Sequence, residues 1–182
     1  QLNKGFCGTD DKIRIAKYYL HPFEEPVISG TFGSGTIFFC GCSLKCVFCQ
    51  NHELSRNLRG KEITTKELAD IFKILEDKGA HNINLVSPAP YVPIIAEAII
   101  HARKLGLTVP IVYNTNAYET VDTIRQLEGL VDIYLPDLKY IDSGISKKYS
   151  GAADYFEYAS EAINEMYRQC GLLELDSHGM AR

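Results

Sequence analysis

The chain has 182 residues, of which 46% are hydrophobic, and its net charge is −4. This size suits one domain that buries its own core without disulfide bonds. No apolar run approaches the roughly 18 residues of a membrane span, and no basic stripe indicates a nucleic-acid partner. With no signal peptide in view, six cysteines predict a reducing compartment, so we expect a cytoplasmic protein.

Residues 1–32 contain few periodic signals, and we interpret them as an N-terminal extension. Apolar and polar residues alternate over 13–20, which predicts a strand, and Pro22 and Pro26 predict a loop after it. Residues 33–182 form the expected core domain. The chain starts at Gln1 and stops at Arg182 in a turn-like stretch, so we expect a piece of a longer protein, truncated at its C-terminus.

Strand and helix patterns alternate four times along the core domain. Short runs of β-branched and aromatic residues predict strands over 36–40, 82–86, 109–113 and 131–135. Apolar residues at helical spacing predict helices over 64–79, 91–105, 120–127 and 154–170. A capping box, Thr64 with Glu67, begins the first of these helices, and Gly79 ends it.

This alternation predicts an α/β fold with a parallel sheet and crossover helices on one side. Each β/α unit takes about 35 residues, so the chain is too short for a closed barrel of eight units. An open, incomplete barrel of about four units is the fold that we expect. The strand over 131–135 then lies at an edge of the sheet.

Three cysteines, Cys42, Cys46 and Cys49, form a C-x₃-C-x₂-C motif in the loop after the first core strand. Three thiolates can ligate three irons of a [4Fe-4S] cluster and leave the fourth iron open to a substrate or cofactor. Structural zinc is a weaker alternative, because it needs a fourth ligand, and Cys7, Cys170 and His52 are poorly placed to supply one.

This motif, with aromatic Phe48 before its last cysteine, resembles the loop of radical S-adenosylmethionine (SAM) enzymes. The resemblance implies a barrel of six β/α units, of which this chain matches the first four, and two cofactors, a [4Fe-4S] cluster and SAM. It points to proteins related to pyruvate formate-lyase activating enzyme. It also implies that Phe48 lies against the adenine, and that Gln50 and Asn51 shape the cluster loop and reach SAM.

The ends of the later strands carry polar residues, where parallel barrels place their chemistry. Ser87 follows the second strand, within Ser87-Pro88-Ala89-Pro90, where radical SAM proteins usually have Gly-Gly-Glu-Pro to hold the SAM amino group. Without the glycines and the acid, Ser87 is the best remaining side chain for SAM, and the alternative is a rigid turn that starts the next helix.

Asn114, Thr115 and Asn116 follow the third strand, where activating enzymes have a similar stretch beside SAM. The Asn116 amide suits ribose hydroxyls or a carboxylate, although asparagine is also common in ordinary turns. Asp137 and Lys139 follow the fourth strand and should point to one side, where they could orient substrate or SAM as catalytic residues. The alternative for this pair is a surface salt bridge.

The resemblance implies two kinds of partner. One is a glycyl radical enzyme, or another protein or peptide, as the substrate. The other is an electron donor such as flavodoxin or ferredoxin. Two alternatives stay open: a radical SAM enzyme that acts on a small molecule, and an iron–sulfur electron-transfer or metal-binding module without SAM chemistry, which the altered Ser87-Pro88 turn favours.

Overall fold

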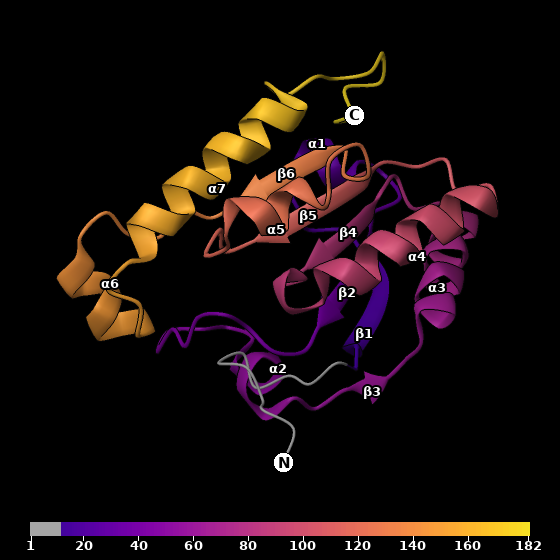
Figure 1. Ribbon diagram of the computed structural model, residues 1–182. Helices are drawn as coiled ribbons and strands as arrows, with labels where there is room; N and C mark the ends of the chain where they lie inside the picture. The colour runs from indigo at the N-terminus through magenta and orange to yellow at the C-terminus, as the bar shows by residue number, and fades with distance from the viewer. Residues whose placement is uncertain (1–11) are drawn as a thin grey trace.

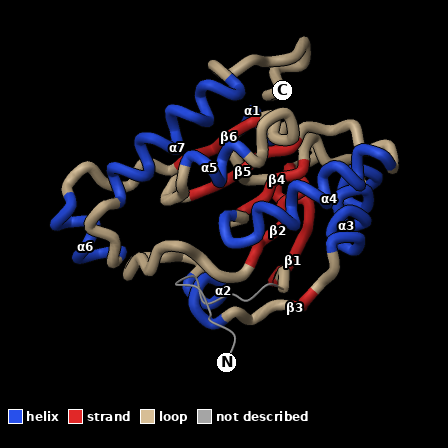
Figure 2. The backbone as a smooth tube through the Cα atoms, in the orientation of Figure 1, coloured by secondary structure: helices blue, strands red, loops and turns tan. Residues whose placement is uncertain are grey.

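The computed structural model describes residues 12–182, so Cys7 lies outside the described residues. Six strands form one open sheet with the order β3-β1-β2-β4-β5-β6. From β2 to β6, strands and helices alternate along the chain, and two helices, α6 and α7, follow β6 (Figures 1 and 2). The predicted fold class is therefore confirmed: the domain is an open α/β sheet, mostly parallel, as expected for an incomplete β/α barrel.

Four neighbouring strands of the sheet are parallel: β2 (Ser34–Phe39), β4 (Ile83–Val86), β5 (Ile111–Thr115) and β6 (Ile133–Pro136). Their register places Phe38, Val86, Asn114 and Leu135 in one row across the sheet. Because these strands run in the same direction, the loops that follow them all emerge at one edge of the sheet.

Two further strands are antiparallel, so the sheet is mixed and not parallel throughout. β1 (Arg14–His21) pairs with β2, and the short β3 (Lys61–Glu62) pairs with β1. The connection from β1 to β2 contains only the one-turn helix α1 (Pro26–Ser29). Such a connection turns the chain back beside itself, whereas a parallel pair needs a longer crossover.

The strand predicted over 13–20 has an interrupted alternation. The pairing of β1 with β2 shifts register between Ile15 and Lys17, as at a β-bulge. An inserted residue moves the following side chains to the opposite face. Ile13 and Ile15 accordingly belong to the main core, whereas Lys17, Tyr19 and His21 line a cavity on the other side of the sheet.

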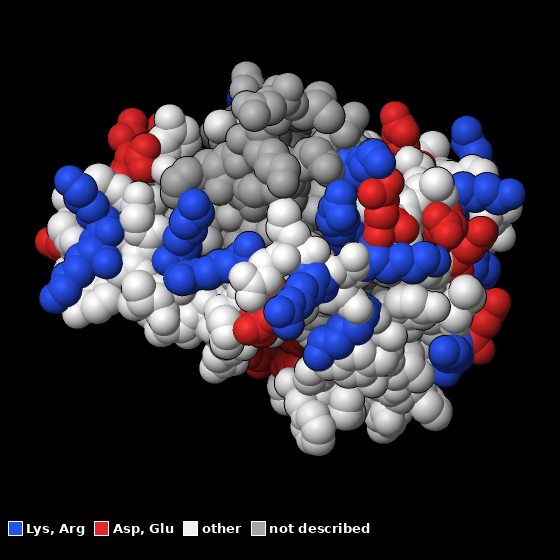
Figure 3. All heavy atoms as spheres, turned by 90° about the horizontal axis from the view of Figure 1, so that it is seen from below, with Lys and Arg blue, Asp and Glu red and all other residues white. Residues whose placement is uncertain are grey.

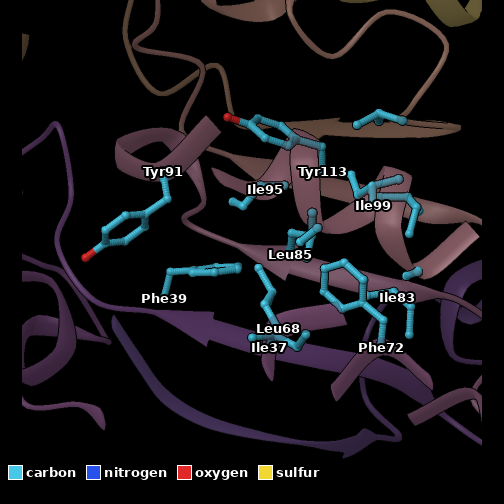
Figure 4. Close-up of a cluster of buried hydrophobic side chains, with 14 of the residues drawn as sticks. Ile37, Phe39, Leu68, Phe72, Ile83, Leu85, Tyr91, Ile95, Ile99 and Tyr113 are labelled. Carbon is cyan, nitrogen blue, oxygen red and sulfur yellow. The ribbon is translucent and has the colours of Figure 1, made fainter. Parts of the chain in front are cut away.

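The main core lies between the sheet and four helices on one face (Figure 1). These helices are α3 (Thr65–Asp77), α4 (Val92–Lys104), α5 (Val121–Arg125) and α7 (Tyr155–Cys170). A 3₁₀ turn, Ala89–Tyr91, precedes α4. Figure 4 shows strand residues such as Ile37 and Leu85 packed against Leu68 and Ile95 of the helices. The expected placement of the crossover helices on one side agrees with this core.

A smaller core lies on the other face of the sheet. Ile28 of α1 packs there with Val112 and Ile133, and Ala181 near the C-terminus joins them. Two short helices complete the domain, α2 (His52–Asn57) after the cysteine loop and α6 (Ser143–Ser150) before α7. Neither α2 nor α6 was predicted from the sequence.

The third predicted strand begins two residues later than expected, at Ile111. Just before it, side chains form hydrogen bonds with the backbone of Val109. Glu76 accepts from the Val109 amide at 3.1 Å, and Arg103 donates to the Val109 carbonyl at 2.9 Å. These contacts take up both backbone groups of Val109, so the hydrogen bonds to β4 begin only at the Pro110 carbonyl, which accepts the Ile83 amide at 2.9 Å. The predicted capping box of α3 is confirmed, with both reciprocal hydrogen bonds between Thr64 and Glu67.

Candidate functional site

The three cysteines of the motif lie on the loop that leaves β2 and reaches α2. Cys46 is buried, and Cys42 and Cys49 are half-buried. The loop packs against α6, α7 and the end of β5 through a small apolar cluster that includes Leu44, Ala117 and Tyr155. Its backbone is also tied to α6, because the Val47 amide donates to the Tyr149 carbonyl at 2.8 Å.

Each cysteine sulfur has a hydrogen-bonding group beside it. The Asn116 amide donates to Cys42 Sγ at 3.2 Å, and the Ser150 hydroxyl donates to Cys46 Sγ at 2.8 Å. Ser55 lies 3.6 Å from Cys49 Sγ. Donors of this kind stabilise thiolate and tune the potential of a cluster that it ligates.

The donor set fits a three-cysteine cluster. Burial raises the pKa of the Cys42 thiol, although the Leu44 amide and the Asn116 side chain favour its thiolate. A bound metal cation overcomes such a shift, because a coordinating thiol is deprotonated outright. Within residues 12–182, no three Cys, His, Asp or Glu side chains converge on a single-ion site. A cluster spreads its cysteines over several irons.

A cavity of about 760 Å³ opens beside the cysteine loop, and its walls come from β1, β2 and the ends of β4, β5 and β6. This volume is within the usual range for a small-molecule or cofactor site. The cavity brings together every site residue that the sequence predicts: Cys42, Cys46, Phe48, Cys49, Gln50, Asn51, Ser87, Asn114, Thr115, Asn116, Asp137 and Lys139.

Several of these polar side chains are available to a ligand. Among the described residues, Gln50, Asn51, Ser87 and Asn114 make no side-chain hydrogen bond, although all four line the cavity. Ser87 also has a φ of 59°, the left-handed region that glycine adopts without strain. The turn after β4 therefore keeps a conformation that favours glycine although the sequence has serine there.

Asn116 and Thr115 have structural partners. The Asn116 Oδ1 accepts the Tyr118 amide at 2.8 Å, so this side chain holds its own turn as well as the Cys42 sulfur. Thr115 donates its hydroxyl to Glu119, which also accepts from the Tyr113 hydroxyl at 2.7 Å. Burial raises the pKa of the Glu119 carboxyl, although these two hydroxyls oppose the shift.

Asp137 and Lys139 point to the same side and form an ion pair at 2.6 Å, as their spacing predicts. The Tyr155 hydroxyl from α7 lies 2.6 Å from the Asp137 carbonyl oxygen and accepts the Lys139 amide at 2.9 Å. It also lies 2.9 Å from the Asn116 carbonyl. One buried tyrosine thus fixes the ends of β5 and β6, with its pKa raised to about 12, mainly by burial.

Phe48 lines the cavity, is 56% exposed and makes an edge-to-face type of contact with Tyr140 at a centroid distance of 6.4 Å. More than half of its surface is therefore free to contact a ligand. His52 is exposed at the start of α2, as expected, and Cys40 is fully buried behind the loop.

Three parts of the site were missed in the sequence. Tyr155 and Ser150 come from helices far along the chain, where nothing in their spacing links them to the cysteines. The wall formed by Lys17, Tyr19 and His21 was missed because the bulge in β1 reverses the face on which these residues lie. The alternation of Tyr19, His21 and Phe23 was an available signal for one aromatic face.

A family model described as the radical SAM superfamily matches residues 36–170, which include the cysteine loop, the four parallel strands and the helices that cover them. The chain belongs to the radical SAM superfamily. Members of this superfamily use a [4Fe-4S] cluster and SAM, and the cavity has the three-cysteine loop that such a cluster requires. The pattern C-x₃-C-x₂-C predicted the family correctly.

The chain is also similar to the uncharacterized protein MJ0674 of Methanocaldococcus jannaschii, with 34% identity over 166 residues. The matched part is 86% of this chain and 47% of that protein, so the chain spans about half the length of this relative. Within residues 12–182, no helix is both long enough and apolar enough to cross a bilayer.

Proposed function

We propose that this chain is the SAM-binding core of an enzyme that abstracts hydrogen with a 5′-deoxyadenosyl radical. Cys42, Cys46 and Cys49 hold the cluster, and SAM occupies the adjoining cavity. When bound, the reduced cluster supplies one electron to the sulfonium of SAM, which breaks into methionine and the 5′-deoxyadenosyl radical. The observation that carries this proposal is the single cavity shared by the cysteine loop and the polar strand ends.

The chain's own residues have binding and positioning roles in this proposal. Ser87 and Asn114 have free polar groups for the methionyl and ribose parts of SAM, and Phe48 offers a ring face to adenine. Gln50 and Asn51 border the cluster side of the cavity. Asn116 and Thr115 hold the turn after β5 in place. The Asp137–Lys139 ion pair orients the reacting groups in the cavity.

For the substrate we propose a glycyl radical enzyme as the partner, in line with the resemblance of the Asn114-Thr115-Asn116 stretch and Asp137 to activating enzymes. The abstracted atom is then a glycine α-hydrogen. The electron comes from a small cytoplasmic donor such as flavodoxin or ferredoxin. The lining of the cavity includes the exposed Phe48 and Gln50, which a protein segment could reach.

Anaerobic reconstitution with iron and sulfide, followed by dithionite and SAM, tests the activity. We expect 5′-deoxyadenosine and methionine in equal amounts, and none from a variant with Cys42, Cys46 and Cys49 all replaced by alanine. A cluster that forms without any SAM cleavage would instead favour an electron-transfer module. A glycyl radical signal on a partner protein in electron paramagnetic resonance (EPR) would support the activating role, whereas deuterium transfer to 5′-deoxyadenosine from a labelled small molecule alone would refute it.

A further inference from the structure

The cavity has a second wall that none of the proposed SAM contacts uses. It consists of Lys17, Tyr19 and His21 on β1 and Phe38 on β2. The SAM contacts proposed above come instead from the loop after β2 and from the ends of β4, β5 and β6. In the sheet order β1 lies on the other side of β2 from those strands. The wall therefore faces the cavity from the side opposite β5 and β6.

The side chains of this wall form one continuous surface. The Tyr19 ring contacts His21 at a centroid distance of 5.4 Å and Phe38 at 5.8 Å, and the His21 and Phe38 rings are 6.5 Å apart, so the three rings form a compact triangle. The Lys17 ammonium lies 4.7 Å from the Phe38 centroid and 5.2 Å from that of Tyr19. The rings hold the cation over their faces. The result is a positive group over the Tyr19 and Phe38 faces of a compact aromatic cluster.

Lys17 has no carboxylate partner among residues 12–182, and the other charged groups of the cavity do not neutralise it. Lys139 is paired with Asp137. Glu24 follows the far end of β1, and strand geometry places His21, which precedes it, about 13 Å along the chain from Lys17. The face seen from below carries lysine and arginine side chains over much of its width, with aspartate and glutamate side chains among them (Figure 3). An anion entering the cavity thus meets an ammonium that no carboxylate of the described residues neutralises.

The strand register places Lys17 in the same row across the sheet as Asn114, one of the proposed SAM contacts. Lys17 pairs with Phe38, and the row continues through Val86 to Asn114. With strands about 4.8 Å apart, β1 and β5 are separated by up to about 14 Å across the sheet. A group bound by Lys17 therefore shares the cavity with SAM without occupying the β5 side.

We propose that Lys17, with Tyr19 and Phe38, binds an anionic group of the substrate, a carboxylate next to an apolar or planar body. This inference rests on the proposed function only in calling the ligand a substrate. The same carboxylate chemistry has two sources, an acidic side chain near the target glycine of a protein, or a small aromatic acid. The bulge in β1 is the feature that turns Lys17 into the cavity and makes the site.

Binding to the holoprotein saturated with SAM, measured by calorimetry, tests the proposal. The probes are two matched pairs: the peptides acetyl-Ala-Gly-Glu-Ala-amide and its Gln counterpart, and benzoate and benzamide. We expect the charged member of one pair to bind at least tenfold more tightly than its neutral match. Lys17→Met should remove this preference and Lys17→Arg should retain it. The pair that shows the preference identifies the source.

Lys148→Met is the matched control, because the Lys148 ammonium also lies over a ring, Tyr149 at 5.0 Å, but outside the cavity. It should bind the charged probe as the wild type does. Two results would overturn the proposal: no charge preference in either pair, or a loss of SAM affinity in Lys17→Met as large as the loss of probe affinity. Absence of 5′-deoxyadenosine in the wild type would refute the proposed function instead and leave the binding result standing.

Discussion

The sulfur atoms of Cys42, Cys46 and Cys49 are each contacted by a residue from a different part of the chain. Asn116 follows β5, Ser150 ends α6, and Ser55 lies in α2. The contact of Ser150 is the shortest and is buried, at 2.8 Å from Cys46. The fold thus sets the electrostatic environment of the cluster from outside the cysteine motif.

Replacing Ser150 with alanine should lower the reduction potential of the cluster. A donor to sulfur favours the more negative, reduced state, so its loss favours oxidation. A hydrogen bond contributes about 1 kcal/mol, which for one electron is about 40 mV. Redox titration followed by EPR measures the shift. Ser146→Ala is the control, because that buried hydroxyl on the same helix donates to the Ala152 carbonyl; an equal shift in both variants would contradict the assignment.

The turn after β4 offers a second test at this scale. Ser87 occupies the left-handed region, so Ser87→Gly removes the hydroxyl while relieving backbone strain. We expect thermal stability within about 0.5 kcal/mol of wild type, and SAM affinity lower by roughly 2- to 10-fold, the value of one hydrogen bond. Ser87→Val should instead lose about 1–2 kcal/mol of stability, because a β-branched residue is strained there. Unchanged SAM affinity in Ser87→Gly would remove this hydroxyl from the site.

At the scale of elements, the long regular ones were predictable and the short polar ones were not. The capping box and the buried Leu68, Ile71, Phe72 and Leu75 fixed α3 from the sequence. The helix α6 was not predicted, because its only buried residues are Ser146 and Ser150 and the sequence there has no apolar periodicity. Its caps were visible signals, Asp142 accepting from the Ile145 amide and Gly151 with a φ of 78°.

Only those parts of the candidate site that belong to local sequence motifs were predictable. The cysteine spacing and the polar strand ends identified one half of the cavity. The β1 wall depends on a register shift between Ile15 and Lys17, and Tyr155 and Ser150 depend on how α6 and α7 dock on the sheet. Register and docking are decided by tertiary contacts, which a single sequence does not display.

The connection between α3 and β5 predicts a pH dependence of stability. Burial alone raises the pKa of the Glu76 carboxyl, but hydrogen bonds from Lys73, Thr108 and Val109 lower it to about 2. A carboxyl with a lowered pKa stabilises the fold above its unfolded value near 4.5, and the stabilisation is lost as the pH falls toward 2.

Glu76→Gln should therefore lower the free energy of unfolding at pH 5 and flatten its decline on acidification. The wild type should lose on the order of 2 kcal/mol more than the variant between pH 5 and pH 3. Urea unfolding of the apoprotein at the two pH values measures the difference. Glu97→Gln on the exposed side of α4 is the control, and it should decline as the wild type does. Parallel declines in all three proteins would show that Glu76 does not carry this stability.

At the scale of the whole molecule, the two faces of the sheet have different roles: one packs against the main core and the other borders the cavity. The helices α3, α4, α5 and α7 bury the main core on one face, and the cavity opens on the other face, at the edge where the parallel strands end. The antiparallel β1 extends the sheet on the side opposite β6 and supplies the second wall of the cavity. The proposed reaction needs both walls, one for SAM and one for the substrate.

The most direct test of the proposed function is whether SAM binds at the cluster held by Cys42, Cys46 and Cys49. The measurement is the EPR spectrum of the dithionite-reduced protein with and without SAM labelled with ¹⁵N and ¹⁷O in its amino acid part, together with electron–nuclear double resonance. We expect SAM to change the spectrum and the label to couple magnetically to the cluster, since the three cysteines leave one iron open. A reduced cluster whose spectrum is unchanged by saturating SAM, with no coupling to the label, would contradict SAM binding at this cluster.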